Sequence, residues 1–255
     1  MTSTRPLEHT VALVTGASSG IGEATAIAIA NLGAAVALAA RRTERLETLA
    51  ATLRGHGATV LVITADITDR AQATDAVDQT VKELGRLDTL INNAGVMLLG
   101  PVVGAPVEEW EQMVRINLLG LLYCTNAALP HLLSAAEDSP RGVADLVNIS
   151  SVAGRETRSG SGVYNATKHA VGAFSDALRK EVTKRHVRVS LVEPGAVETE
   201  LAGHNRPEIR AAMDERFAGI ERLQSEDIAE IIAFIVSRSR HVAVNEVLVR
   251  PTDQE

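Results

Sequence analysis

The chain has 255 residues, 45% of them hydrophobic, which is enough for one large core, and we expect a single domain over 1–255. Its formal charge of −7 and its 2% of aromatic residues argue against a nucleic-acid partner, which needs a basic surface or stacking rings. Cys124 is the only cysteine, so an intrachain disulfide and a cysteine-based metal site are excluded.

The polarity of the first residues and the length of the apolar runs bear on location. Residues 1–10 are polar and predict no secretory signal. The most apolar stretch, residues 26–40, is too short to cross a bilayer and is interrupted by Asn31 and Gly33. We therefore expect a cytoplasmic protein with no membrane partner, because a lone cysteine suits a reducing compartment.

Strand and helix patterns alternate from the start of the chain. Residues 9–15 contain a short apolar run, a glycine-rich turn follows, and residues 23–32 have a helical pattern that ends at Gly33, a typical C-cap residue. Ala35–Ala40 is a second apolar run. Together these segments predict a βαβ unit with two parallel strands.

The same alternation continues to the end of the chain. We expect helices over 43–54, 68–84, 106–134, 161–186 and 225–236, the last with Ser225 as N-cap, and strands over 58–64, 87–91, 143–149, 187–192 and 242–249. Residues 137–142 predict a surface turn, and residues 199–221 predict a loop with one or two helices. Near-continuous apolar strands between helices predict a Rossmann-like α/β fold: a doubly wound parallel sheet of about seven strands with helices on both faces.

A glycine turn joins the first strand to the first helix. Gly16, Gly20 and Gly22 are placed so that backbone N–H groups and the helix dipole can meet a pyrophosphate with no side chain in the way. A tight turn without a ligand is the alternative. The strand before the turn and the helix after it favour the phosphate-binding interpretation.

Two arginines follow the second strand, where dinucleotide-binding proteins often carry an acid for the ribose 2′-hydroxyl. That position is Ala40 here, and Arg41 and Arg42 suit the 2′-phosphate of NADP, since guanidinium groups match phosphate oxygens. A solvated helix start is the alternative. Asp66, after the third strand, is either an acceptor for the adenine amino group or the N-cap of the next helix.

Tyr164 and Lys168 are four residues apart, so on a helix their side chains leave the same face one turn apart. A cation beside a phenol favours the phenolate and allows proton exchange near neutral pH. Ser151, at the end of an apolar run, is placed to hydrogen-bond the oxygen that the tyrosine protonates. The alternative is an incidental pair on a surface helix.

Asn117 lies inside a long apolar helix, where a buried amide needs partners, either structural ones or a functional water network. The seven histidines show no metal-ligand spacing, so no metal site is expected. The chain also contains no G-x-S-x-G sequence, which argues against a Ser-His-Asp hydrolase.

Six motifs occur in one order along the chain: the glycine turn, residues 92–95 (Asn-Asn-Ala-Gly), Asn117, Ser151, the Tyr164/Lys168 pair and Pro194-Gly195. On these motifs the sequence resembles the short-chain dehydrogenases/reductases over nearly its whole length. Residues 249–254 look like the bacterial subgroup that contains clavulanic-aldehyde reductase.

The resemblance implies an oxidoreductase, a carbonyl reductase or alcohol dehydrogenase, that transfers hydride between NADP(H) and a small to medium aldehyde, ketone or secondary alcohol. Tyr164 would be the general acid/base, and Lys168 would lower its pKa and bind the nicotinamide ribose. Ser151 would hold the substrate oxygen. Asn117 would hold a water that links Lys168 to solvent.

The resemblance also implies residues that surround the cofactor. Besides Tyr164 and Lys168, these are Gly16, Ser18, Ser19, Gly20, Ile21 and Gly22 at the phosphates and ribose, Arg41 and Arg42 at the 2′-phosphate, Asp66 and Ile67 at the adenine, Asn93, Ala94 and Gly95 at the fourth strand, and Pro194, Gly195, Val197 and Thr199 near the carboxamide. Residues 96–99, 152–162 and 196–217 would shape the substrate pocket, with a lid at about 196–220.

Several alternatives remain open. Arg155 and Arg158 could bind a substrate carboxylate or pair with Glu156 or another subunit. The enzyme could instead oxidise a hydroxy acid or sugar, or the chain could be a non-enzymatic NADP-binding redox sensor. The family resemblance implies a homodimer or homotetramer packed through the helices that carry Asn117 and Tyr164, with Cys124 near such an interface.

Overall fold

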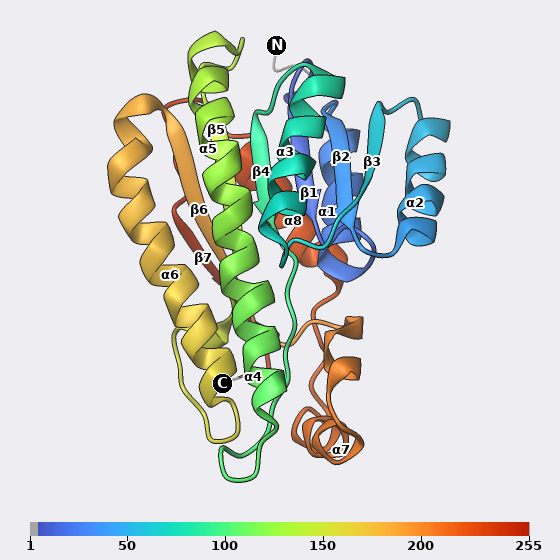
Figure 1. Cartoon of the computed structure of the whole chain (residues 1–255), viewed down its shortest axis with the longest axis vertical. Helices are drawn as coiled ribbons and strands as arrows, with labels where there is room; N and C mark the ends of the chain where they lie inside the picture. Colours follow the sequence, from blue (N-terminus) through green and yellow to red (C-terminus); the bar gives the residue numbers. More distant parts are fainter. Residues whose placement is uncertain (1–4, 255) are drawn as a thin grey trace.

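The computed structural model describes residues 5–254. Seven parallel strands form one sheet in the order β3-β2-β1-β4-β5-β6-β7 (Figure 1), which confirms the predicted fold class. Between β3 and β4 the chain crosses from one half of the sheet to the other, and ligands of such sheets bind where this reversal opens a crevice at the carboxyl ends. The strands are β1 Val11–Thr15, β2 Ala35–Ala40, β3 Val60–Thr64, β4 Thr89–Asn92, β5 Ala144–Ile149, β6 Val187–Pro194 and β7 Glu246–Val249.

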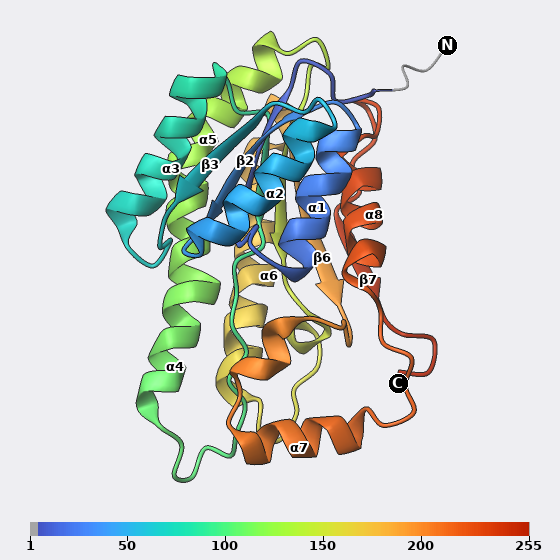
Figure 2. The same ribbon diagram turned by 90° about the vertical axis from the view of Figure 1, so that its right-hand side faces the viewer.

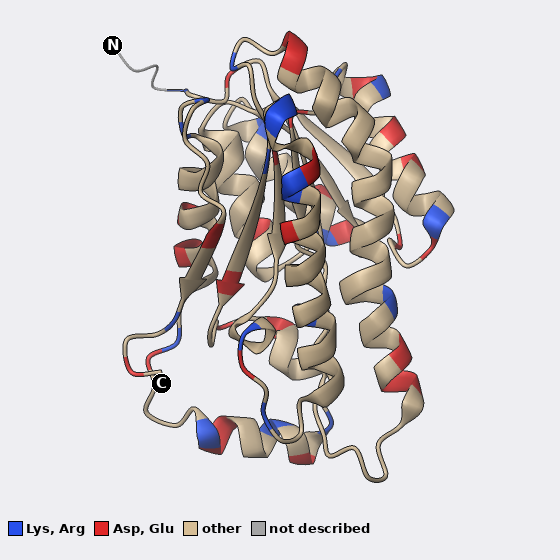
Figure 3. Ribbon diagram, turned by 90° about the vertical axis from the view of Figure 1, so that its left-hand side faces the viewer, with Lys and Arg blue, Asp and Glu red and all other residues tan. Residues whose placement is uncertain are grey.

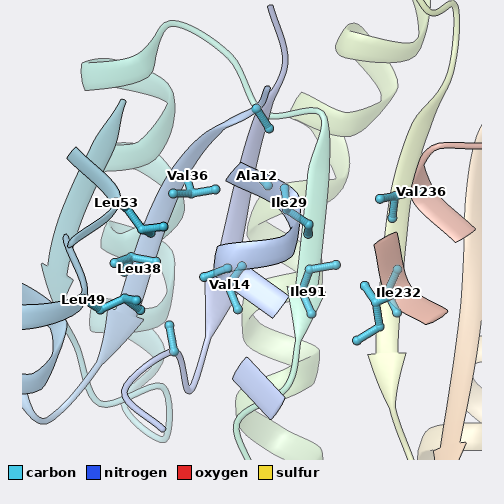
Figure 4. Packing of buried hydrophobic residues seen from close by; sticks show 14 of the residues in the cluster. Ala12, Val14, Ile29, Val36, Leu38, Leu49, Leu53, Ile91, Ile232 and Val236 are labelled. Carbon is cyan, nitrogen blue, oxygen red and sulfur yellow. The ribbon is translucent and has the colours of Figure 1, made fainter. Parts of the chain in front are cut away.

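Helices cover both faces of the sheet (Figure 2). One face carries α1 (Gly20–Asn31), α2 (Thr43–Gly55) and α8 (Ser225–Val236), and the other carries α3 (Arg70–Leu84), α4 (Val107–Val114), α5 (Leu121–Asp138) and α6 (Gly162–Val182). Along β2, Val36 and Leu38 join the core under the first group (Figure 4), while Ala37 and Ala39 join the core under the second. Both faces of β2 are therefore buried, which explains its unbroken apolar sequence.

The long helix predicted over 106–134 is longer and less regular than expected. It consists of α4, a π-helical segment Arg115–Gly120, and α5, which ends at Asp138. Asn117 lies inside the π-helical segment. Such wide turns are rare and often occur at functional sites. This one contains Asn117, the polar residue that the sequence singles out in the apolar helix.

Of the two alternatives for Asp66, the N-cap is wrong. Helix α3 begins at Arg70 instead of residue 68, and its N-cap is Asp69, whose carboxylate accepts hydrogen bonds from the backbone N–H groups of Ala71 and Gln72 at 2.8 and 3.1 Å. Asp66 accepts from the backbone and hydroxyl of Thr68, at 3.0 and 2.8 Å. This turn before the helix leaves Asp66 beside the end of β3.

Three further boundaries differ from the predictions. The N-cap of α8 is Gln224 and not Ser225, because Gln224 forms a reciprocal capping box with Asp227. Helix α6 ends at Val182 and gives way to a 3₁₀ turn, after which His186 adopts a left-handed conformation. The last strand was predicted over 242–249 and is shorter, Glu246–Val249.

The segment 196–220, here called the lid, lies beyond the carboxyl ends of the strands (Figure 2). It contains a 3₁₀ turn, Glu200–His204, and α7, Pro207–Arg216, in agreement with the one or two helices predicted. The backbone N–H of Leu99 donates to Asn205 at 2.7 Å, and Arg206 pairs with Glu109 at 3.2 Å. These contacts fasten the lid to the loop after β4 and to the start of α4.

The stretch from α4 to α5, Val107–Asp138, is long and apolar enough to cross a membrane by length and composition, which the sequence analysis did not single out. In the structure it packs against α3, β4 and β5, as a helix of a protein core does. Cys124 is buried on its inner side, with 0% exposure. Its position near a subunit interface stays a prediction. The absence of a membrane partner stays a prediction.

Candidate active site

A cavity of about 620 Å³ opens at the carboxyl ends of the strands, between the sheet and the lid. The ends of β1 to β6 and the lid all contribute to its wall. All the cofactor residues predicted from the sequence line this cavity, except Gly22. Ser151 and parts of all three predicted substrate segments line it as well. The topology thus brings together residues that are far apart in the sequence.

The glycine turn has a backbone that other residues would strain. Gly16 and Gly20 have φ angles of +67° and +57°, in the left-handed region. A Cβ on Gly16 would lie 2.8 Å from the Cα of Ala94, and a Cβ on Gly22 would lie 2.4 Å from the carbonyl oxygen of Gly16. Gly22 therefore permits tight packing behind the turn, while Gly16 and Gly20 face the cavity.

Asn93 shapes this turn as well as bordering the cavity. Its Nδ2 donates to the carbonyl oxygens of Thr15 and Gly16, at 3.0 and 3.3 Å. The hydroxyl of Thr15 in turn accepts from the backbone N–H groups of Asn93 and Ala94, at 3.1 and 3.2 Å. Thr15 was not predicted as a site residue, because it lies at the end of an apolar strand.

Arg42 extends along the glycine turn from the end of β2. Its Nε and Nη2 atoms donate to the hydroxyls of Ser18 and Ser19, at 3.1 and 2.5 Å. Its Nη1 atom pairs with Glu200 of the lid at 2.7 Å, and Arg45 pairs with the same carboxylate at 2.6 Å. Arg41 is exposed and lines the cavity nearby. Glu200 and Arg45 were not predicted, because nothing local in the sequence links them to Arg42.

Ser151, Tyr164 and Lys168 meet at the other end of the cavity, as predicted. Ser151 caps the 3₁₀ turn Val152–Gly154 that follows β5, and its side chain hydrogen-bonds that of Tyr164. The Nζ atom of Lys168 lies 5.8 Å from the centre of the tyrosine ring. Tyr164 and Lys168 are each only 6% exposed.

Burial dominates the acid–base properties of this pair. It raises the pKa of Tyr164 to about 12, while the hydrogen bond with Ser151 acts in the opposite direction. It lowers the pKa of Lys168 to about 8. Desolvation penalises the charged form of each group, so the protein by itself keeps the phenol protonated. The lowering of the pKa of Tyr164 by Lys168 stays a prediction.

The side chain of Asn117 forms hydrogen bonds to Val96, a residue that lines the cavity. Its Oδ1 accepts from the backbone N–H of Val96 at 2.8 Å, and its Nδ2 donates to the carbonyl of Val96 at 2.9 Å and to Thr167 at 3.2 Å. A Cβ on Gly95 would lie 3.3 Å from the Oδ1 of Asn117 and 3.9 Å from the Nζ of Lys168. The predicted water-holding role of Asn117 stays a prediction.

Two polar residues beside Ser151, Tyr164 and Lys168 were missed in the sequence. Asn165 donates to the carbonyls of Ala153 and Glu156, at 2.8 and 2.7 Å, and so fixes the loop after Ser151. Ser150 donates to the carbonyl of Lys168 at 3.1 Å. Their position next to predicted residues is the only signal, because their partners are backbone groups.

A family model described as short chain dehydrogenase matches residues 10–210, well over half of the chain. The chain belongs to the short-chain dehydrogenase family. The motif order, the sheet and the Ser151/Tyr164/Lys168 cluster are all consistent with this assignment. The narrower likeness to the subgroup with clavulanic-aldehyde reductase stays a prediction.

Relatives and solved structures agree with the family. The chain is 36% identical over 246 residues to an uncharacterized oxidoreductase of Staphylococcus saprophyticus, covering 96% of this chain and 98% of the relative. It is 39% identical over 249 residues to glycine betaine reductase of Emericella nidulans, covering 98% of this chain and only 19% of that longer protein. The closed form of a serine dehydrogenase complexed with NADP⁺ superposes with a TM-score of 0.87 and 31% identity, over 96% of each chain.

Arg155 and Arg158, the two arginines considered as ligands of a substrate carboxylate, have different surroundings. Arg155 pairs with Glu193 at 2.8 Å and with Glu246, which holds it against β6 and β7. Arg158 lies at the cavity wall and pairs with Glu156 at 3.5 Å. Arg155 is therefore structural, and Arg158 stays a candidate. Within residues 5–254, no three His, Cys, Asp or Glu side chains are grouped as a metal site requires.

Proposed function

We propose that this protein is an NADP(H)-dependent oxidoreductase that reduces a small to medium aldehyde or ketone, or oxidises the corresponding secondary alcohol. We further propose one catalytic domain with a lid over 196–220. The observation that carries the proposal is the shared cavity: Ser151, Tyr164 and Lys168 lie at one end, and the glycine turn with Arg42 lies at the other.

The residues of the turn fit a dinucleotide. Gly16 has no room for a side chain toward Ala94, and α1 begins at Gly20, so its N-terminal N–H groups can meet a pyrophosphate. Arg41 and Arg42 at the end of β2 favour NADP over NAD, since Ala40 supplies no carboxylate for a free ribose. When bound, the cofactor supplies or accepts the hydride at its nicotinamide.

The side chains of the protein then handle the proton. In reduction, Tyr164 gives its phenolic proton to the carbonyl oxygen, and in oxidation the phenolate takes the proton of the alcohol. Ser151 donates a hydrogen bond to the same oxygen and so stabilises the charge that develops there. Lys168 would hold the nicotinamide ribose, and its charge would favour the phenolate over the phenol.

The proposal is tested by incubating the protein and NADPH with a panel of aldehydes and ketones and recording the loss of NADPH absorbance. We expect oxidation with at least one class of carbonyl compound. Cofactor binding without oxidation of any substrate, in either direction, would contradict the proposal and favour the redox sensor. The test separates the two because the sensor needs no reacting substrate.

A hydroxy acid is a second candidate substrate, favoured by the cations at the cavity wall. Arg158 and Arg216 both line the cavity, and burial and the charge of Arg158 lower the pKa of Arg216. A carboxylate would relieve their repulsion. We expect Arg216→Gln to raise KM for a carboxylate-bearing alcohol at least about threefold more than for its methyl ester, as loss of one exposed ion pair implies.

We also propose a cytoplasmic homodimer or homotetramer packed through α5 and α6. The middle turns of these helices carry few charged residues on the face shown in Figure 3. Val107 and Val114 on the adjoining α4 are 53% and 37% exposed. Burial of such a face against a second copy is favourable. Light scattering coupled to gel filtration tests this proposal, and a monomer at micromolar concentration would contradict it.

A further inference from the structure

A carboxylate of the lid pairs with Arg42, one of the two arginines that we assign to the cofactor phosphate, and with the neighbouring Arg45. Glu200 lies in the 3₁₀ turn of the lid, more than 150 residues after β2 in the sequence. Its Oε2 pairs with the Nη1 atom of Arg42 at 2.7 Å, and its Oε1 pairs with the Nη1 atom of Arg45 at 2.6 Å. One carboxylate thus bridges two guanidinium groups at the rim of the cavity.

We propose that Glu200 is a specificity-determining residue that competes with the 2′-phosphate of NADP(H) for Arg42 and Arg45. NADP(H) has to displace this carboxylate, whereas NAD(H), which has no 2′-phosphate, binds without displacing it. The inference rests on the NADP(H) assignment of the proposed function. It predicts that the protein prefers NADP(H) over NAD(H) less strongly than it would without the Glu200 carboxylate.

The hydrogen bonds of Arg42 support competition for one group. Its Nε and Nη2 atoms are held by Ser18 and Ser19 of the glycine turn, at 3.1 and 2.5 Å, and Nη1 is the atom that pairs with Glu200. A phosphate near the glycine turn and the Glu200 carboxylate would need the same guanidinium edge, because both are anionic oxygen acceptors.

The ion pairs are weak enough to exchange. The side chains of Arg42, Arg45 and Glu200 are 43%, 49% and 45% exposed, and solvent screens pairs of this kind. Protonation does not release Glu200, because the two guanidinium groups lower its pKa to about 2. A second anion is therefore the means of displacement near neutral pH.

The position of Glu200 also links the competition to the lid. Thr199, the preceding residue, caps the same 3₁₀ turn, and its Cγ2 atom would lie 3.2 Å from a Cβ on Gly20. Glu200 is therefore the first residue of a turn whose cap lies beside the first residue of α1. The 2′-phosphate and the lid would thus be coupled through one side chain.

The test compares Glu200→Gln with the matched control Glu198→Gln. Glu198 is an exposed carboxylate two residues earlier in the lid, and its Oε2 accepts from Gln224 at 3.1 Å instead of contacting Arg42. Dissociation constants for NADPH, NADH and adenosine 2′,5′-bisphosphate are measured by calorimetry on the full chain. We expect Glu200→Gln to tighten NADPH and the bisphosphate by about three- to tenfold, as loss of weak competing ion pairs implies, with NADH unchanged and Glu198→Gln without effect.

Each other outcome decides against the inference in a distinct way. Weaker NADPH binding in Glu200→Gln would show that Glu200 positions Arg42 for the phosphate. Unchanged NADPH binding in Glu200→Gln and in Glu200→Ala would show that the phosphate lies elsewhere, for example at Arg41, while the proposed function stands. Failure of the wild-type chain to bind NADPH or the bisphosphate would overturn the cofactor assignment itself, and the inference with it.

Discussion

Two clusters of buried ionisable groups, one at each end of the sheet, have opposite kinds of partner. At the amino ends, Asp145 accepts from both Arg188, at 2.7 and 2.9 Å, and Arg141, at 3.3 Å. At the carboxyl ends, Lys168 is as deeply buried but donates to a neutral acceptor, the carbonyl of Ile149, at 2.9 Å. Beside it, Tyr164 bonds with the neutral Ser151.

This difference separates groups that hold the fold from groups that can react. A buried charge with an oppositely charged partner is held in one state, since removal of either partner leaves an isolated charge. A buried ionisable group with neutral partners keeps a displaced pKa and can exchange protons with a ligand. The cluster around Asp145 should therefore govern stability, and the Tyr164/Lys168 pair should govern turnover.

The largest expected effect is the loss of turnover in Tyr164→Phe. The substitution removes the proton donor and leaves the buried ring, so kcat should fall by roughly 10²–10⁴-fold, while the dissociation constant for NADPH stays within about twofold. Steady-state rates and cofactor titration check this on one preparation. Retention of more than a few per cent of the rate would remove Tyr164 from the mechanism.

At the opposite end, Asp145→Asn should lower stability and spare the chemistry. Arg188 is 7% exposed and would keep its charge without a carboxylate partner, which costs roughly 3–5 kcal/mol of the free energy of unfolding. Denaturant unfolding measures this cost, and the activity per folded molecule should stay near that of the wild type.

The exposed pair Arg185–Glu137, at 2.6 Å, is the control. Glu137→Gln should change the free energy of unfolding by no more than about 1 kcal/mol. Equal effects of the two substitutions would show that burial does not distinguish the amino end of the sheet from the surface.

The third effect concerns cofactor choice at the carboxyl end. Each charge-assisted contact to a phosphate contributes roughly 1.5–3 kcal/mol, so Arg41→Ala with Arg42→Ala should weaken NADPH by at least about tenfold and leave NADH nearly unchanged. Titration with both cofactors measures the difference. An unchanged ratio of the two dissociation constants would refute the 2′-phosphate assignment.

The fold and the core of the site could be predicted because their signals are local. Apolar runs between helical patterns give the strands, and the glycine turn and the Tyr164/Lys168 spacing depend on neighbours within a few residues. The N-caps of α3 and α8 were placed three residues and one residue away from Asp69 and Gln224, because neighbouring polar residues are equally suitable as N-caps. Propensity alone does not decide between adjacent polar residues.

The remaining features depend on contacts that no spacing in the sequence reveals. Glu200 reaches Arg42 only after the lid folds across the cavity, and Asp145 meets Arg188 only after β5 and β6 pair. Asn117, in the π-helical segment, likewise forms hydrogen bonds to distant partners, the backbone of Val96 and the hydroxyl of Thr167. Long-range partners determine these features, so sequence patterns miss them.

The smallest expected effect is a gain in stability from Lys168→Met in the ligand-free protein. Burial lowers the pKa of Lys168 from 10.5 to about 8, which corresponds to roughly 3 kcal/mol of unfavourable free energy for the folded state. Loss of the hydrogen bond to Ile149 offsets about 1 kcal/mol of the gain. A net increase of roughly 1–2 kcal/mol in the free energy of unfolding is expected at pH 7, together with loss of turnover.

The pH dependence gives this last prediction its sign. Below pH 8 the lysine is charged in both the folded and the unfolded state, so the full penalty applies to the wild type. Between pH 8 and 10.5 only the unfolded state keeps the proton, and the wild type gains stability relative to Lys168→Met as the pH rises. Lys180→Met, on the same helix with a side chain 73% exposed, should show no such trend. The difference in the free energy of unfolding between Lys168→Met and the wild type should therefore shrink from pH 7 to 10. A constant difference would contradict the desolvation of Lys168 in the folded protein.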